Sequence, residues 1–153
     1  MGIAARHALD ALLHPSCVAI IGASDDPLRI GGRPIAYMRS EGFTGRILPV
    51  NPGRSTVQGL PAYASVHALP ETPDVAIIAV AAKSCVQVVA DLAERGTAAA
   101  IVFSAGFAEA GPEGEAAQRA MVAAARLHGM RVLGPNSLGL VNPRNGFYGS
   151  FVS

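Results

Sequence analysis

The sequence predicts an α/β fold with a doubly wound, mostly parallel sheet of about five strands and helices on both faces. Short continuous apolar runs without alternation indicate strands that are buried on both faces. Segments with helical spacing alternate with these runs along the whole chain of 153 residues. Half of the residues are hydrophobic but only 5% are aromatic, with 17 glycines and no tryptophan. Small aliphatic side chains of this kind favour helices packed closely on a buried parallel sheet.

Two strands and two helices are predicted in the first third of the chain. The run at 18–21 is apolar throughout and predicts a buried strand, and Arg46 to Val50 predicts a second strand that 51–53 end. Alanines and leucines from Ala5 to Leu12 lie at helical spacing and predict a short leading helix that ends before Pro15. A second helix is expected to begin at Pro34 and to end at Gly42.

Three further strands follow a stretch that lacks periodicity. Residues 55–73 carry three prolines and predict an irregular crossover with one helical turn near 66–69. Apolar runs at 75–80 and 98–103 predict the third and fourth strands, and Arg131 to Leu133 predicts the fifth.

Two longer helices are expected between these last strands. Ser84 and Gln87 have the spacing of a capping box, which predicts the start of a helix that Gly96 ends. An alanine-rich helix follows Pro112 and runs to about His128.

Composition excludes several function classes. A net charge of +1 gives no reason to expect nucleic acid or an anionic membrane as a partner. The two cysteines, Cys17 and Cys85, and the four histidines show no metal-ligand spacing, so neither a metal site nor a disulfide framework is expected. The chain shows no signal peptide and no apolar run of ~18 residues, and the expectation is a cytoplasmic protein.

The carboxyl ends of the five predicted strands carry small, polar or basic residues. In an open parallel sheet these ends form one crevice, where ligands bind near the point at which the strand order reverses. A strand that ends in a small-residue turn before a helix is also a common site for phosphate. The five ends are Gly22 to Ser24, Asn51 to Arg54, Val80 to Lys83, Ser104 to Phe107 and Gly134 to Ser137.

The glycine spacing argues against an ordinary NAD site. After the first strand the chain has Gly22, Gly31 and Gly32 in place of the G-x-G-x-x-G pattern. After the second strand it has Arg54 in place of the acidic residue that binds the ribose hydroxyls of NAD. A guanidinium suits a phosphate on that ribose, and both NADP and coenzyme A carry one.

Four segments resemble the CoA-binding N-terminal domain of NDP-forming (ADP-forming) acyl-CoA synthetases, similar to the alpha subunit of succinyl-CoA synthetase. They are residues 9–24, 50–52, 104–111 and 134–139. The resemblance implies a Rossmann-like fold and coenzyme A as the ligand. It implies further synthetase domains or a beta subunit as partners, and ATP, ADP and magnesium only through those other domains. The oligomeric state is left open, a homo-oligomer included.

The resemblance also implies where CoA would lie. Residues 22–24 would meet the diphosphate, Arg54 the CoA phosphate, and residues 80–82 the adenosine or the start of the pantetheine arm. Residues 104–107 and Asn136 would line the arm towards the thiol. The candidate cofactor-binding residues are Gly22, Ala23, Ser24, Arg29, Gly31, Gly32, Asn51, Pro52, Arg54, Val80, Ala81, Ala82, Lys83, Ser104, Ala105, Gly106, Phe107 and Asn136.

Three positions depart from the family pattern, and four candidate residues each fit two different roles. Arg54 replaces the commoner lysine, Ala81 stands where proline is common, and Ser137 stands where many members have cysteine. Phe107 fits core packing as well as a lid over the ligand, and Lys83 fits a solvated position as well as a ligand contact. Solvated surface positions fit Arg29 and Arg33 as well.

By resemblance, the family reaction joins a carboxylic acid to CoA with ATP, through an acyl phosphate and a phosphohistidine in a following domain. The whole chain, 1–153, is therefore expected to be a single CoA-binding domain that binds CoA without catalysis, and residues 145–153 end it where the next domain of the family would begin. No catalytic residue or metal ligand is expected in it. Two alternatives are an NADP-binding domain of an oxidoreductase and a CoA-sensing region of a protein acetyltransferase, and the acyl substrate stays open.

Overall fold

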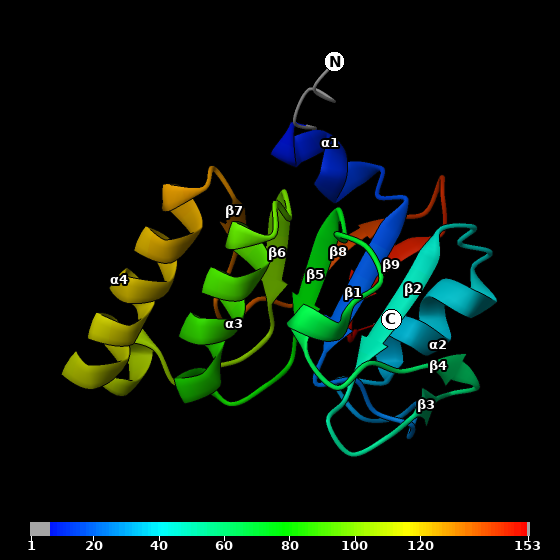
Figure 1. Cartoon of the computed structure of the whole chain (residues 1–153), viewed down its shortest axis with the longest axis horizontal. Coiled ribbons are helices and arrows are strands. Elements are labelled where there is room, and N and C mark those ends of the chain that lie inside the picture. Colours follow the sequence, from blue (N-terminus) through cyan, green and yellow to red (C-terminus); the bar gives the residue numbers. More distant parts are fainter. Residues whose placement is uncertain (1–6, 153) are drawn as a thin grey trace.

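A five-stranded parallel sheet forms the centre of the molecule, as the computed structural model of residues 7–152 shows (Figure 1). The strand order is β2-β1-β5-β6-β7, and every neighbouring pair is parallel. This is a doubly wound order in which the chain reverses its direction of travel at β1, and it confirms the predicted fold class. The strands are β1 (Cys17–Ile21), β2 (Arg46–Val50), β5 (Val75–Ile78), β6 (Ala99–Val102) and β7 (Arg131–Leu133).

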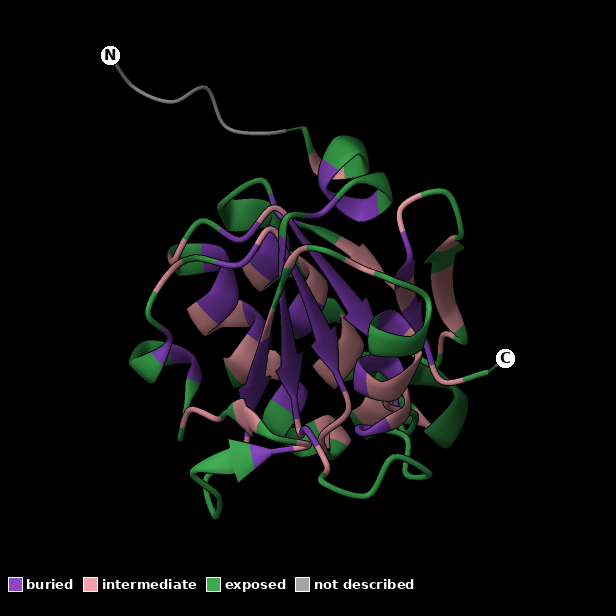
Figure 2. Ribbon diagram, turned by 90° about the vertical axis from the view of Figure 1, so that its right-hand side faces the viewer, coloured by how far each residue is buried: buried purple, intermediate pink, exposed green. Residues whose placement is uncertain are grey.

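The central strands are apolar at every position because both faces of the sheet are covered. All residues of β1, β5 and β6 are buried, as the purple strands of Figure 2 show. The register aligns alanines across three strands, at Ala19, Ala76 and Ala100. These small side chains belong to the apolar cluster that includes α3 and α4, so the helices can approach that face closely.

Helices cover both faces of the sheet. The helices are α1 (Ala8–Leu13), α2 (Arg33–Ser40), α3 (Ala82–Glu94) and α4 (Pro112–Leu127). Residues of α3 and α4 share one apolar cluster with one face, and residues of α1 and α2 share a second cluster with the other. The predicted helices are therefore confirmed, although Ala5 of the leading helix lies outside the described residues. None of the helices within residues 7–152 is long and apolar enough to cross a membrane.

The predicted capping box of α3 is wrong. Strand β5 ends at Ile78, two residues earlier than expected, so the helix begins at Ala82 rather than after Ser84. The N-cap is Ala81, which has no side chain to accept a hydrogen bond, and its carbonyl accepts the Ser84 N–H at 2.8 Å. Gln87 instead donates to Asp91 one turn along the helix at 2.7 Å.

The irregular crossover contains a hairpin that the sequence did not predict. Strands β3 (Thr56–Val57) and β4 (Leu60–Pro61) pair antiparallel through a turn at Gln58 and Gly59. Both turn residues have positive φ, 48° and 77°, which is the geometry of a tight two-residue hairpin. The expected helical turn is present as η1 (Val66–Ala68).

A second hairpin packs on the sheet beside α2. Strands β8 (Gly139–Asn142) and β9 (Phe147–Ser150) pair antiparallel, and Phe147 is fully buried in the cluster that contains α1 and α2. Strand β9 therefore packs into the same apolar cluster as α1 and α2.

Candidate functional site

A cleft of about 1040 Å³ lies at the carboxyl ends of β2, β1 and β5. Asn51, Gly22 and Ala79, which follow these three strands, line it together with the loop that leads into α2. The strand order reverses at β1, so the cleft occupies the position where open α/β sheets bind ligands. The structure thus brings the first two predicted strand ends together.

Three glycines allow the loop of residues 22–32, the glycine loop, to fold back on the end of β1. Gly22 has φ 84°, and a Cβ there would lie 2.5 Å from the Ala79 carbonyl oxygen. A Cβ on Gly31 would overlap the carbonyl oxygen of Gly22, and one on Gly32 that of Asp26. The spacing therefore differs from the dinucleotide pattern because this loop is longer and closes against its own start.

Backbone amides at the turn are largely used within the fold. The N–H groups of Gly22 and Ala23 donate to the Val50 carbonyl at 3.2 and 3.1 Å, and that of Ser24 donates to Gly31 at 3.2 Å. Among residues 7–152, no hydrogen bond occupies the N–H groups of Asp25, Ile30 and Gly31. An anion in the cleft would find open donors at residues 25–31 of the glycine loop rather than at residues 22–24.

Two arginines at the cleft have exposed guanidinium groups. Arg54 Nη1 lies 3.3 Å from Asp25 Oδ2, with 53% of its side chain exposed. Arg29 Nε lies 3.8 Å from Asp26 Oδ2, with 77% exposed. Ion pairs this exposed contribute little to stability, so a ligand phosphate could replace either carboxylate at small cost.

Arg33 has a structural position. Its Nε donates to the Leu28 carbonyl at 2.9 Å and its Nη1 to the Phe151 carbonyl at 3.0 Å. These bonds connect the glycine loop to Phe151 near the end of the described chain. The Nε and Nη1 groups of Arg33 are therefore already occupied.

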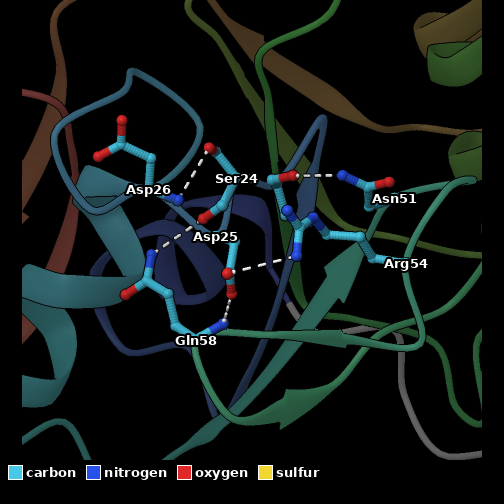
Figure 3. Close-up of polar contacts among 7 residues, drawn as sticks. Ser24, Asp25, Asp26, Asn51, Arg54 and Gln58 are labelled. Atoms are coloured by element: carbon cyan, nitrogen blue, oxygen red, sulfur yellow. Dashed lines mark hydrogen bonds and ion pairs between the residues drawn. The ribbon is translucent and has the colours of Figure 1, made fainter.

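Asn51 connects the ends of β1 and β2. Its Nδ2 donates to the Ala23 carbonyl at 2.9 Å (Figure 3). Its Oδ1 accepts the Gly53 N–H at 2.8 Å. Pro52 lies between these contacts, is exposed and does not line the cleft. Asn51 therefore positions the loop that carries Arg54.

The other predicted site residues gather at the ends of β5, β6 and β7, outside the lining of the cleft. The Ser104 hydroxyl donates to the Val80 carbonyl, and the Ser104 carbonyl accepts the Asn136 N–H at 2.9 Å. A Cβ on Gly106 would lie 3.5 Å from the Ala82 side chain, so the β6 loop contacts the start of α3. The structure therefore groups these three strand ends along the same edge of the sheet.

Three of the remaining candidates, Ala81, Lys83 and Ala105, are exposed beside this group. Lys83 lies in the first turn of α3, where both of its open roles stay compatible with the structure. Phe107 is fully buried in the apolar cluster with α3 and α4. Of its two roles, core packing is the one that the structure supports.

Glu109 is a site feature that the sequence reasoning missed. Its Oε1 accepts the N–H groups of Gly106 and Phe107 at 2.6 and 3.2 Å. These backbone hydrogen bonds lower the pKa of the Glu109 carboxyl. The Glu109 carboxylate therefore stabilises the β6 loop by accepting two of its backbone N–H groups.

Asp25 and Gln58 were not predicted as partners. Asp25 accepts the Gln58 N–H at 2.7 Å, in addition to its contact with Arg54. Asp26 accepts the Leu28 N–H at 2.9 Å within the glycine loop. No local pattern could have connected residues 33 positions apart across a hairpin that was itself unpredicted.

Thiol and metal chemistry have no support in the described residues. Burial and the neighbouring Glu71 raise the pKa of Cys17 to about 12, and burial raises the pKa of Cys85. Neither thiol is therefore poised as a nucleophile. Within residues 7–152, no group of three histidine, cysteine, aspartate or glutamate side chains could hold a metal ion.

Comparison with known proteins identifies the family. The family described as CoA binding domain matches residues 16–143. An ADP-forming acetate–CoA ligase II from Archaeoglobus fulgidus is 39% identical over 140 residues, which is 92% of this chain and 21% of the ligase. A trans-feruloyl-CoA synthase from an unknown prokaryotic organism is 42% identical over 134 residues, 88% of this chain and 19% of the synthase.

A solved structure shows the same architecture. The dinucleotide-forming acetyl-coenzyme A synthetase 1 of Ca. Korarchaeum cryptofilum, in its apo form, superposes with a TM-score of 0.87 and 36% identity. The match covers 94% of this chain and 31% of that one. This chain thus spans a third or less of each of these relatives. The family match over residues 16–143 shows that the chain belongs to the CoA-binding domain family.

Proposed function

We propose that this chain is the CoA-binding part of an ADP-forming acyl-CoA synthetase, the ligase that joins a carboxylic acid to CoA with ATP. The observation that carries the proposal is the cleft at the sheet reversal, where Arg29 and Arg54 present exposed guanidinium groups beside unoccupied backbone amides. Relatives of this chain that are named as CoA ligases and CoA synthases support it. The remaining synthetase domains or a second subunit are the partners that we propose, and the cytoplasm is the proposed compartment.

CoA would extend along the carboxyl edge of the sheet. Its diphosphate lies by the glycine loop, where Arg29 and the open N–H groups offer donors. Arg54 binds the 3′-phosphate at the end of β2. The pantetheine arm then runs past residues 80–82 and 104–106 towards Asn136, so the thiol leaves the sheet near the end of β7. This course places every phosphate on a charged or N–H donor and the neutral arm on small residues.

Calorimetric titration tests the phosphate contact. Arg54→Met should weaken CoA binding by about 10- to 100-fold, the range expected for one charge-assisted contact. The same variant should bind CoA and dephospho-CoA equally, whereas the wild type should prefer CoA. Arg144→Met, at an exposed turn residue of the β8–β9 hairpin, is the matched control and should bind as the wild type does. Equal affinity of the wild type for CoA and dephospho-CoA would reject the role of Arg54.

Two rival functions are separated by further ligands. An NADP-binding domain would bind NADPH and not CoA, so NADPH binding alone would reverse the proposal. In the complete natural protein, a synthetase converts ATP to ADP beyond a single turnover only when CoA and a carboxylic acid are both present. A CoA-sensing acetyltransferase would instead transfer the acetyl group of acetyl-CoA to a protein lysine without consuming ATP. Because relatives are named for acetate and for ferulate, a panel of aliphatic and aromatic acids is the appropriate substrate set.

A further inference from the structure

Gln58 connects the β3–β4 hairpin to both ends of the glycine loop. Its side-chain Nε2 donates to the Ser24 carbonyl at 3.0 Å and to the Gly32 carbonyl at 2.9 Å. Its backbone N–H donates to Asp25 Oδ1 at 2.7 Å. Figure 3 shows Gln58 directed towards Ser24 and Asp25 from the strand ribbon below them.

Both amide hydrogens of Gln58 are therefore used to close one loop. The two carbonyls that it joins flank the segment that carries Arg29 and the open N–H groups of the cleft. The Ser24–Gly31 backbone contact and the close approach of the glycines also connect the ends of this segment. The amide thus determines where the donors of the glycine loop lie.

Gln58 also determines the position of the partner of Arg54. The Asp25 carboxylate accepts from Gln58 through Oδ1 and contacts Arg54 through Oδ2. From the opposite side, Arg39 of α2 donates to the Gln58 carbonyl at 2.5 Å. Gln58 has φ 48°, a conformation that a residue other than glycine rarely adopts. Contacts on three sides keep it there, as is common for strained residues at functional sites.

We propose that Gln58 is a positioning residue for the phosphate site. It acts through the glycine loop and through Asp25, and it does not touch the ligand itself. This inference rests on the proposed function, because it concerns the geometry of the same CoA site. An amide suits this position because its NH₂ group supplies two donors, one for each of the two carbonyl oxygens.

The isosteric substitution Gln58→Glu separates this role from simple space filling. An ionised glutamate would place a negative charge against two carbonyl oxygens and beside Asp25. The other charged groups around the hairpin are Arg39 and Arg54, and Asp26 and Arg29 lie further along the glycine loop. At low pH a protonated glutamate regains one donor and loses the charge, so the defect should become smaller.

Calorimetry with CoA at pH 8 and at pH 5 is the test, with the affinity of each variant divided by that of the wild type at the same pH. Gln58→Glu should bind CoA at least about tenfold more weakly at pH 8, with partial recovery at pH 5. Gln87→Glu introduces the same charge on the exposed side of α3 and should match the wild type at both values. Amide hydrogen exchange over residues 25–31 should be faster in Gln58→Glu than in the control.

Two outcomes would overturn the inference: wild-type affinity of Gln58→Glu at pH 8, or a loss of equal size at both pH values. Should that variant fail to fold, Gln58→Met removes the donors without adding charge and should still weaken CoA binding with no change of the ratio with pH. Unchanged binding by Gln58→Met would then reject the role. A wild-type chain that does not bind CoA would instead overturn the proposed function, while hydrogen exchange would still show whether Gln58 holds the loop.

Discussion

Gly31 lies at the closest approach between the glycine loop and the end of β1. A side chain at this position would overlap the Gly22 carbonyl, so the loop would have to move away from the cleft. The sequence indicated a glycine requirement here through its unusual spacing, but not which atoms impose it.

Gly31→Ala is expected to abolish most CoA binding. We expect at least about a tenfold loss of affinity in calorimetry, and a free energy of unfolding lowered by ~1–3 kcal/mol in urea because the overlap is with backbone. Gly53→Ala is the matched control, since its Cβ would meet only the Asn51 side chain at an ordinary 3.5 Å. Equal binding by the two variants would show that the close approach of the loop does not form the site.

Glu109 should make the β6 loop sensitive to acid. Its pKa is lowered in the folded state by the Gly106 and Phe107 amides. A lowered folded pKa gives a stabilisation that is present above the ordinary value near 4.5 and is lost as pH falls through the folded pKa. Urea unfolding from pH 7 down to pH 3 should therefore show a smaller loss of stability in Glu109→Gln than in the wild type. Glu113→Gln, at an exposed residue in the first turn of α4, should follow the wild-type curve. Parallel curves for all three proteins would contradict this role of Glu109.

The two hairpins have different relations to the sheet. The β3–β4 hairpin carries Gln58 to the glycine loop and so contributes to the candidate site. The β8–β9 hairpin covers the second face of the sheet, where Phe147 contacts Phe43 with ring centroids 6.1 Å apart. Both were missed from the sequence because their strands are not continuous apolar runs, since each carries threonine, proline, glycine or a polar residue.

Removal of the Phe147 ring should destabilise the fold without acting on the ligand. Phe147→Ala leaves a cavity in a fully buried position, and its cost should be about 3–5 kcal/mol in urea unfolding. Val141→Ala on the same hairpin is the control, because that side chain is 39% exposed and should cost less than about 0.5 kcal/mol. A small loss in Phe147→Ala would mean that the hairpin does not contribute to the core.

Ligand binding should stabilise the whole molecule, because the cleft is formed by three strands and a loop that separate on unfolding. At a CoA concentration of 100 times Kd, the free energy of unfolding should rise by about 2.7 kcal/mol. That corresponds to an increase in Tm of roughly 5–10 °C for a chain of this size. Differential scanning calorimetry measures the shift, and salt should reduce it because phosphate contacts are screened.

Pantetheine, which lacks the nucleotide phosphates, is the control ligand and should give a much smaller shift in Tm. A shift of the same size for pantetheine and CoA would place the binding energy in the arm rather than at the arginines of the cleft.

Much of the fold could be predicted from local patterns. Strands β1, β5 and β6 are buried on both faces, so each is an uninterrupted apolar run that the sequence displays directly. The helix boundaries followed from Pro34, Gly96 and Pro112, with the start of α3 as the exception. Its first turn depended on where β5 ends, and that is decided by pairing with neighbouring strands.

For the candidate site too, local patterns predicted some residues and missed the contacts between distant segments. The glycines and Arg54 were recognisable because strand ends in a parallel sheet converge, whatever the details of the loops. The sequence did not show that the N–H groups of residues 22–24 are used within the fold, nor that Gln58 and Asp25 are linked. The partners of these groups lie in segments far apart in sequence. Burial and backbone conformation are set by short-range chemistry and leave a local pattern. Hydrogen bonds across loops depend on the tertiary fold that brings their donors and acceptors together, and they leave none.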